Sequence, residues 1–161
     1  MKEHQISIER IQELFSYDPM AGTITRIKSY GRAIAGQVFS DALCISVDGI
    51  SIRANRLAWA LHNGMWPPEG HWIDHKDGTK LNIKIVNLRL ATPTQNQQNK
   101  AGYGIFAKGV TWRDRIEKPF QAKIRTGGKR IHLGSFATEE EAAQAYREAA
   151  IKYHGEFACH D

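Results

Sequence analysis

An aspartate and a histidine lie side by side at Asp74-His75, and two amide side chains follow at Asn87 and Asn96. A histidine whose pKa lies near neutrality can accept a proton from water. A carboxylate and an amide carbonyl supply the oxygen ligands that hard divalent cations prefer. These residue types suit the hydrolysis of a phosphodiester with one bound cation, which stabilises charge on the phosphate and on the leaving oxygen. The chemistry requires that the four side chains meet in space.

The segment around these residues is predicted to run strand, loop, strand, helix. Trp72-Ile73 reads as a short strand that leads into the pair, and residues 88–91 read as the returning strand. Thr92-Pro93-Thr94 fits a helix start, which places Asn96 in the first helical turn.

Adjacent side chains on an extended segment point in divergent directions. Asp74 can therefore face a metal ion while His75 faces the attacking water. We expect Asn96 to supply a second metal ligand from the helix. Asn87 lies in the loop between the strands, where its amide can tie the loop backbone together and orient His75.

The chain from about residue 55 to residue 99 resembles the HNH endonucleases, a ββα-metal nuclease family, and in particular their phage and intron-homing branch. The resemblance rests on five segments: Asn55-Arg56-Leu57-Ala58-Trp59, Trp66-Pro67, Ile73-Asp74-His75-Lys76-Asp77-Gly78, Asn87-Leu88-Arg89 and Gln95-Asn96-Gln97-Gln98-Asn99. It implies that His75 is the general base, Asn87 the structural asparagine of the catalytic site, and Asp74 with Asn96 the ligands of one Mg²⁺ or Mn²⁺ ion.

Some positions leave alternatives open. Asn99 lies one helical turn after Asn96 and competes for the ligand role, although Asn96 is nearer the helix start. Arg89 could contact a phosphate or form a salt bridge inside the motif. The family often has His where this chain has Asn55, and Asp-Asn-Arg where it has Asn82-Ile83-Lys84.

The C-terminal third is predicted to form three strands, at 109–113, 120–125 and 130–134, and a helix over 138–153. Eight basic side chains lie between residues 108 and 130: Lys108, Arg113, Arg115, Lys118, Lys123, Arg125, Lys129 and Arg130. Strand alternation puts Phe120, Ala122 and Ile124 against the helix and a polar, basic set on the open face. Such a face suits nucleic acid, although a solvated sheet face is the plain alternative.

This third resembles the AP2 DNA-binding domain over residues 109–158. The residues that carry the resemblance are Gly109-Val110-Thr111-Trp112, Phe120-Gln121-Ala122-Lys123-Ile124-Arg125, Ile131-His132-Leu133-Gly134-Ser135-Phe136, Glu141-Ala142-Ala143-Gln144-Ala145-Tyr146 and His154-Gly155-Glu156-Phe157-Ala158. That family places its sheet in the major groove and is known fused to HNH homing nucleases. The DNA-binding residues it implies here are Arg113, Arg115, Gln121, Lys123, Arg125, Lys129 and Arg130.

Composition sets the remaining limits. The chain has 161 residues, a formal charge of +5 and two cysteines, Cys44 and Cys159, with no CxxC pair. No apolar run approaches the roughly 20 residues of a membrane span, and the polar start lacks the apolar stretch of a signal peptide. We expect a cytoplasmic protein that binds double-stranded DNA and no membrane, as a monomer or weak dimer.

The predicted fold class is α+β. We expect an N-terminal extension over residues 1–54 (a helix over 6–16, then strands), an HNH nuclease core over 55–100, a linker over 101–107 and an AP2-like domain over 108–161, with three antiparallel strands packed on one helix. The predicted function is metal-dependent DNA cleavage that leaves 5′-phosphate and 3′-hydroxyl ends. The alternatives are a catalytically decayed sequence-specific DNA-binding protein and, less favoured, an RNA-binding protein, because the sheet lacks exposed aromatic stacking platforms.

Overall fold

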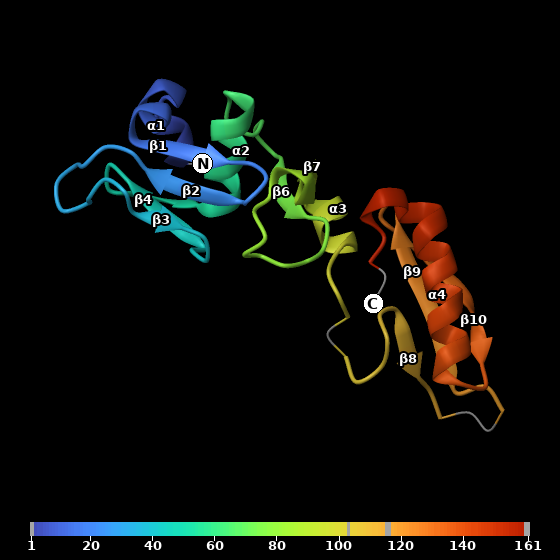
Figure 1. Cartoon of the computed structure of the whole chain (residues 1–161). Helices are drawn as coiled ribbons and strands as arrows, with labels where there is room; N and C mark the ends of the chain where they lie inside the picture. Colours follow the sequence, from blue (N-terminus) through green and yellow to red (C-terminus); the bar gives the residue numbers. More distant parts are fainter. Residues whose placement is uncertain (1, 103, 115–116, 160–161) are drawn as a thin grey trace. The chain divides into compact units, whose positions relative to one another are not determined.

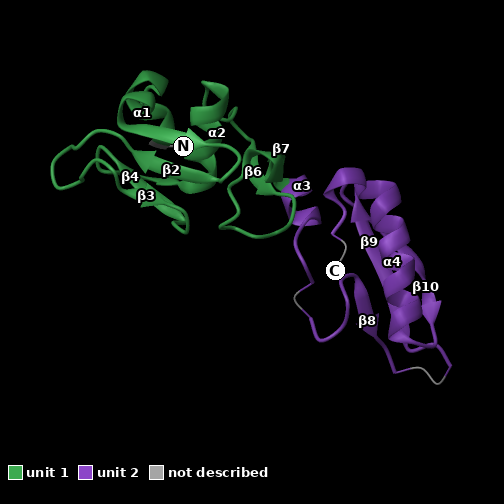
Figure 2. Cartoon of the chain, in the orientation of Figure 1, with its two compact units in different colours: residues 1–93 green, residues 94–161 purple. Residues whose placement is uncertain are grey.

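A computed structural model describes residues 2–102, 104–114 and 117–159 of the chain. Contacts between residues divide the chain into two compact units, Met1–Pro93 and Thr94–Asp161 (Figure 2). Both units mix helices with antiparallel strands, so the α+β fold class is confirmed.

The first unit begins with alternating short helices and strands (Figure 1). In chain order these are η1 (Lys2–Gln5), α1 (Ile8–Leu14), β1 (Phe15–Asp18), β2 (Thr23–Arg26), β3 (Val38–Phe39), β4 (Cys44–Val47), β5 (Ile50–Arg53) and α2 (Ala54–Asn63). The expected helix over 6–16 is shorter than predicted, because Phe15 takes an extended conformation and pairs with Arg26.

Local turn chemistry explains two of these elements. Asp48 and Gly49 both have positive φ, 48° and 81°, which is the conformation that a two-residue hairpin between β4 and β5 requires. The hairpin predicted from Asp48-Gly49 is thus confirmed. Ser7 caps α1 by accepting a hydrogen bond from the backbone N–H of Arg10 at 3.2 Å.

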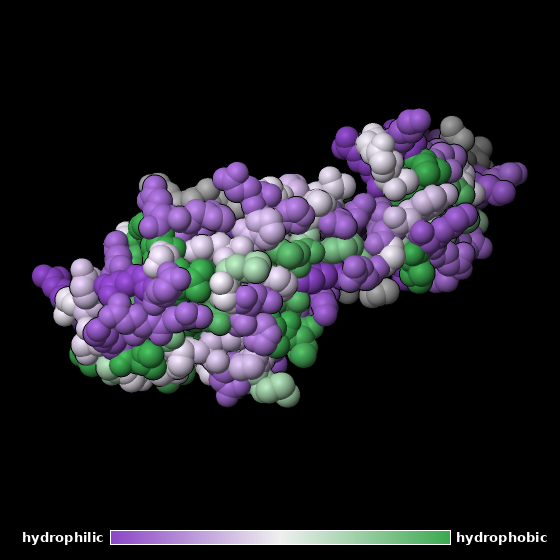
Figure 3. All heavy atoms as spheres, turned by 90° about the horizontal axis from the view of Figure 1, so that it is seen from above, coloured by the Kyte–Doolittle hydropathy of each residue, from purple (hydrophilic) through white to green (hydrophobic). Residues whose placement is uncertain are grey.

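One hydrophobic core joins the N-terminal elements to the segment that resembles a nuclease. Ile11 and Ile24 belong to the same buried cluster as Leu57, Ile73 and Leu88. The N-terminal extension and the residues after 55, up to Pro93, therefore form one packed body rather than two. In the view of Figure 3, hydrophilic residues cover most of the surface, and the apolar atoms that show form separate patches.

The predicted order of strand, loop, strand and helix is present. β6 (Trp72–His75) pairs antiparallel with β7 (Leu88–Ala91), and the short η2 (Ile85–Asn87) lies in the connection. The helix α3 (Pro93–Gln98) follows, and the boundary between the two units falls within it.

The second unit is a three-stranded antiparallel sheet with one long helix on it (Figure 1). Its strands are β8 (Val110–Trp112), β9 (Phe120–Thr126) and β10 (Lys129–Phe136), in the order β10-β9-β8. The helix α4 (Glu139–His154) begins with a capping box between Thr138 and Glu141, as predicted, and η3 (Gly155–Phe157) follows it. Ala122 and Ile124 of β9 are buried on the helix side.

The segment predicted as a linker, 101–107, belongs to this second unit. Phe106 packs edge-on against Phe120 with ring centroids 5.7 Å apart, and the backbone N–H of Ala107 donates to Glu139 Oε1 at 2.8 Å. The ammonium group of Lys108, the residue after the segment, donates to the backbone carbonyls of Gln98, which ends α3, and of Lys100. The first two contacts attach the described part of the segment to the sheet and to α4.

The described helices include none that combines the length and the apolar character needed to cross a bilayer.

Candidate active site

Asp74 and His75 are the last two residues of β6. In the register of the hairpin, Asp74 lies opposite Arg89 and His75 lies opposite Leu88. Asp74 is buried and His75 is partly buried. Because neighbouring residues of a strand face opposite sides, the carboxylate and the imidazole occupy different faces of the hairpin, as the sequence predicted.

Arg89 forms a buried ion pair with Asp74. Its Nε donates a hydrogen bond to Asp74 Oδ2 at 2.9 Å, and its Nη2 lies 2.9 Å from the same oxygen. Of the two alternatives that the sequence left open for Arg89, the salt bridge within the motif is the one in the structure.

Asn87 closes the connection between β6 and β7. Its Nδ2 donates to Asp77 Oδ1 at 2.9 Å and to the carbonyl of Asn82 at 2.8 Å, while its Oδ1 accepts from the backbone N–H of Asp77 at 3.1 Å. Its backbone carbonyl also accepts from the N–H of Lys76. The amide therefore ties the loop together next to His75, and its part in catalysis stays a prediction.

Asp77 is the centre of this loop. Desolvation opposes ionisation of its carboxyl, but hydrogen bonds from Asn82 Nδ2, the Thr79 N–H and Asn87 outweigh that effect and hold the pKa of Asp77 below its ordinary value. The loop that follows the Asp74-His75 pair is thus folded around an ionised carboxylate rather than being a simple glycine turn.

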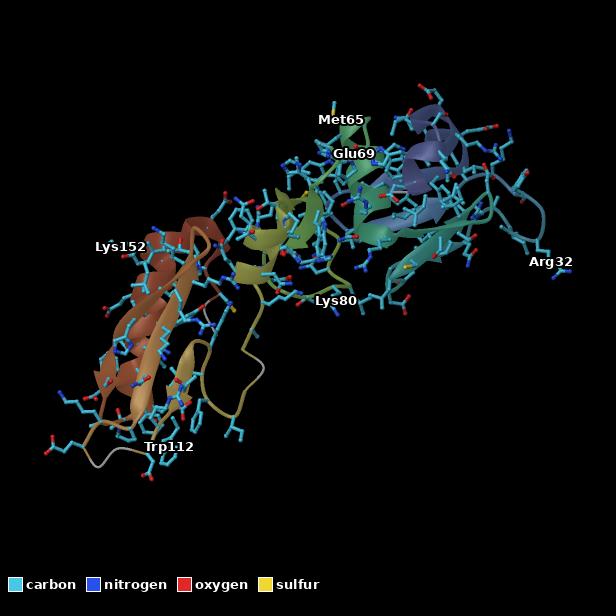
Figure 4. The ribbon with its side chains drawn as sticks, turned by 180° about the vertical axis from the view of Figure 1, so that it is seen from behind. Arg32, Met65, Glu69, Lys80, Trp112 and Lys152 are labelled. Atoms are coloured by element: carbon cyan, nitrogen blue, oxygen red, sulfur yellow. The ribbon has the colours of Figure 1, made fainter. Side chains whose placement is uncertain are left out.

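His75 has a lowered pKa. Burial is the largest cause, and the positive charge of Lys80 acts in the same direction against the opposing charges of Asp74 and Asp77. Lys80 extends from the β6–β7 loop into solvent (Figure 4). A lowered pKa leaves the imidazole neutral near pH 7, which is the form that can accept a proton.

The donor set can be compared with the needs of a divalent cation. Among the residues that the structure describes, no group of three His, Cys, Asp or Glu side chains could hold a metal ion. Mg²⁺ commonly uses only one or two carboxylates and takes its other oxygens from water and phosphate. A carboxylate offers about four lone-pair sites, so a carboxylate that pairs with an arginine is still of the chemical type that can bind a cation. The role of Asp74 as a metal ligand stays a prediction.

The amide expected as the second ligand lies on α3. Asn96 and its rival Asn99 belong to the second unit, whereas Asp74 and His75 belong to the first. The assignment of Asn96 as a ligand rests on the sequence pattern and stays a prediction, as does the choice between Asn96 and Asn99.

The two departures from the family pattern, at Ile83 and Asn55, are buried and make hydrogen bonds. Ile83 is buried in the core of the first unit, and its carbonyl accepts a hydrogen bond from the Tyr17 hydroxyl at 2.5 Å. Asn55 is buried as well, and its Nδ2 donates to the carbonyl of Ile73 at 2.9 Å. The next residue, Arg56, donates from Nη1 to the carbonyl of His71 at 3.1 Å. Sequence reasoning missed these contacts to β6 and to the residue before it, although the position of Asn55 at the start of an apolar helix was a signal.

The open face of the second unit carries basic side chains in opposing pairs. Arg125 lies directly opposite Arg130, and Lys123 lies directly opposite His132. Arg113, Arg125, Lys129 and Arg130 are exposed and Lys123 is partly exposed, while Arg115 lies outside the described residues. Gln121 is buried, and its role in DNA binding stays a prediction. Trp112 of β8 is half exposed, so the expectation that the sheet lacks exposed aromatic side chains is wrong.

Comparison with known proteins identifies the class. Residues 53–98 match the family model of the HNH endonucleases. Protein 3.8 of Escherichia phage T7 is 34% identical over 107 residues, which cover 62% of this chain and 83% of that protein. An uncharacterized HNH endonuclease of Acanthamoeba polyphaga mimivirus is 41% identical over 91 residues, 56% of this chain. The match spans only 47% of the mimivirus protein's own length.

A further similarity, over a shorter stretch, is to plant proteins. An AP2-like ethylene-responsive transcription factor of Arabidopsis thaliana is 52% identical over 50 residues, which cover 30% of this chain and 10% of that protein. No solved structure matches the chain.

Along the chain, a hairpin with Asp-His at the end of its first strand is followed by a loop tied by asparagine and by a helix, which is the order of elements that the sequence predicted. The chain belongs to the HNH endonuclease family. Nucleases of this family generally depend on a divalent metal ion.

Proposed function

We propose that this chain is a DNA endonuclease of the homing type that hydrolyses phosphodiesters with one divalent metal ion. The observation that carries the proposal is the end of β6, where a buried carboxylate adjoins a partly buried imidazole and Asn87 holds the following loop. His75 removes a proton from the attacking water, and the oxygen of that water bonds to phosphorus as the bond to the 3′ oxygen breaks. The products carry 5′-phosphate and 3′-hydroxyl ends.

Asp74 and Asn96 are the proposed ligands of the metal ion, which is Mg²⁺ or Mn²⁺. When bound, the ion supplies charge stabilisation to the phosphate and to the leaving oxygen. Asp74 is suited to this role because it is held by Arg89 in a buried position beside the proposed base. Asn96 is proposed from its place in the first turn of α3, and Asn99 is the alternative.

We further propose that the second unit is an AP2-like domain that binds double-stranded DNA. Two features support this. Strands β8, β9 and β10 contain no Asp or Glu, and two like charges face each other where Arg125 lies directly opposite Arg130. Directly opposed like charges destabilise a sheet, whereas a row of phosphates neutralises them and releases counterions. The contact residues proposed are Arg113, Arg115, Gln121, Lys123, Arg125, Lys129 and Arg130, of which Gln121 would need to become accessible.

One proposed catalytic centre per chain implies that a monomer nicks one strand and that a weak dimer could cut both. The relatives from a phage and a virus favour a protein that acts in the cytoplasm of a host cell.

Cleavage of supercoiled plasmid in Mg²⁺ or Mn²⁺ tests the nuclease proposal. We expect His75→Ala and Asp74→Ala each to abolish nicking, because one removes the base and the other a metal ligand. His71→Ala is the matched control, since this nearby histidine contributes a backbone carbonyl but no proposed catalytic group. If both active-site variants nick as fast as the wild type, the mechanism is wrong.

The rival function is a DNA-binding protein whose nuclease has decayed. The departures from the family pattern at Asn55 and Ile83 favour it, although both residues make buried contacts within the first unit. Wild-type protein that binds duplex DNA in a salt-sensitive manner, yet nicks no plasmid in any divalent metal, would establish this rival.

A further inference from the structure

The outer edge of β6 is held by side chains rather than by a third strand. β6 pairs with β7 in a two-stranded sheet, and the carbonyls of the outer edge of such a strand need other partners. The carbonyls of His71 and Ile73, two residues apart, point to the same edge. They accept hydrogen bonds from Arg56 Nη1 at 3.1 Å and Asn55 Nδ2 at 2.9 Å.

The two donors are neighbours in the first turn of α2, and both are buried, with Asn55 9% and Arg56 6% exposed. Arg56 also forms an ion pair with Glu3 of η1, in which its Nε lies 2.7 Å from Oε1 of the carboxylate. The start of α2 is therefore bonded to the outer edge of β6, and Glu3 of the N-terminal segment contacts the arginine of this pair. A buried amide that holds a backbone carbonyl confines the peptide it binds.

The Asn55 contact has functional interest because it lies next to Asp74. The Ile73 carbonyl is part of the peptide that joins Ile73 to Asp74. That peptide is held on one side by Asn55, while Arg89 holds the Asp74 carboxylate across the hairpin. Two independent contacts thus fix the backbone and the side chain of the same residue.

We propose that Asn55 is a positioning residue of the active site, which sets the orientation of Asp74 and of the adjoining His75. Arg56 and Glu3 keep the start of α2 in place beside β6. This inference rests on the proposed nuclease function. The positioning role also explains why asparagine can stand where the family often has histidine, because either side chain can donate an N–H to the Ile73 carbonyl.

The test compares Asn55→Leu with Asn63→Ala in the full chain. Leucine keeps the number and branching of the heavy atoms of asparagine but donates no hydrogen bond. Asn63 is the control, because it lies on the same helix and its Nδ2 donates to a carbonyl at the same 2.9 Å, that of Trp59 within α2 itself. Asn55→Ala is the second variant, in case leucine prevents folding, and Asn55→His is the rescue.

Three readouts are measured: amide hydrogen exchange of β6, Mn²⁺ affinity by calorimetry, and the kinetics of plasmid nicking. In Asn55→Leu we expect exchange at Asp74, His75 and Lys76 to quicken about 5- to 10-fold, the gain from losing one hydrogen bond. Mn²⁺ affinity and kcat fall about 10- to 100-fold, as when a residue that orients a metal ligand is lost. KM for DNA stays the same, Asn55→His restores all three readouts, and Asn63→Ala changes none.

The inference is overturned if β6 exchange and Mn²⁺ affinity are the same in Asn55→Leu, or in Asn55→Ala, as in Asn63→Ala. A global loss of stability without a selective effect on β6 and on kcat also overturns it, since that is the signature of a purely structural residue. Wild-type protein that neither binds Mn²⁺ nor nicks DNA would instead reject the proposed function, and the catalytic role of Asn55 with it.

Discussion

Arg89 and Asp74 face each other across β6 and β7 and form a buried ion pair, with Nε and Nη2 of the guanidinium both 2.9 Å from Oδ2 of the carboxylate. The carboxylate proposed to hold the metal ion is therefore held by an arginine on the neighbouring strand. A buried charge that loses its partner is far more costly than a well-matched pair.

Arg89→Met should lower the free energy of unfolding by about 3–5 kcal/mol, because it removes the arginine partner of a buried carboxylate. Combining it with Asp74→Asn should recover part of that loss, since the buried charge is then gone. Urea unfolding of the single and double variants measures both effects. Arg32→Met is the control, because Arg32 is exposed and extends away from the chain (Figure 4), and we expect a change within about 0.5 kcal/mol. Strict additivity of the two substitutions would contradict an energetic coupling.

Asn87→Ala should loosen the β6–β7 loop. The substitution removes three hydrogen bonds, those to Asp77 and Asn82 and the one from the Asp77 N–H. Trypsin should then cleave after the exposed Lys80 several times faster than in the wild type, because cleavage follows the population of the opened loop. Mass spectrometry of the fragments over time checks this. Asn63→Ala leaves the loop intact, and equal cleavage in the two variants would show that Asn87 does not hold it.

Alkaline pH should destabilise the first unit through Tyr17. Its hydroxyl donates to the Ile83 carbonyl, and burial raises its pKa to about 12. The unfolded chain releases this proton near pH 10, whereas the folded chain retains it. The stability that the neutral phenol contributes is thus complete below about pH 10 and is lost as pH rises toward 12. Thermal unfolding from pH 8 to pH 12 should show a steeper decline in the wild type than in Tyr17→Phe, which has no proton to lose. Parallel declines would contradict this assignment.

Arg130→Gln should have opposite effects on stability and on DNA binding. Without DNA it should stabilise the second unit by about 0.2–1 kcal/mol, because it removes a like charge directly opposite Arg125. With duplex DNA it should weaken binding and reduce the slope of log K against log salt by about 1. Lys152→Gln removes the same charge from α4, outside the sheet face, and should leave the slope unchanged. A slope that responds equally to both substitutions would argue for nonspecific attraction.

Gly109→Ala should unfold or strongly destabilise the second unit. Gly109 has a φ of +75°, and an added Cβ would lie 2.1 Å from the Tyr146 ring and 2.7 Å from the Lys123 carbonyl oxygen. Gly128→Ala is the matched control, since φ there is +77° but nothing lies within 4 Å of the new atom. We expect the control to lose about 1 kcal/mol from backbone strain alone and Gly109→Ala to lose clearly more in chemical denaturation. Equal losses would mean that the close approach to Tyr146 is relieved by local movement.

Much of the fold could be predicted from local patterns. The hairpin at Asp48-Gly49, the capping box at Thr138 and Glu141, and the strands that flank the Asp74-His75 pair depend on residues close in sequence. The end of α1 could not, because whether Phe15 continues the helix or enters a strand depends on its partner Arg26, eleven positions later. Pairing between strands is a long-range choice that a local apolar pattern does not contain.

The chemistry of the candidate site is likewise divided between sequence and structure. The sequence by itself determined which side chains could act as base and ligand, because residue type and order are enough to define a carboxylate, an imidazole and an amide on strand, loop and helix. Only the tertiary structure decided that Arg89 pairs with Asp74, that Asn87 is bonded to Asp77, and that Asn55 holds the Ile73 carbonyl. Those contacts depend on distances of about 3 Å between groups 10 to 18 residues apart, and such distances are set by how strands pair and how a helix packs against their edge.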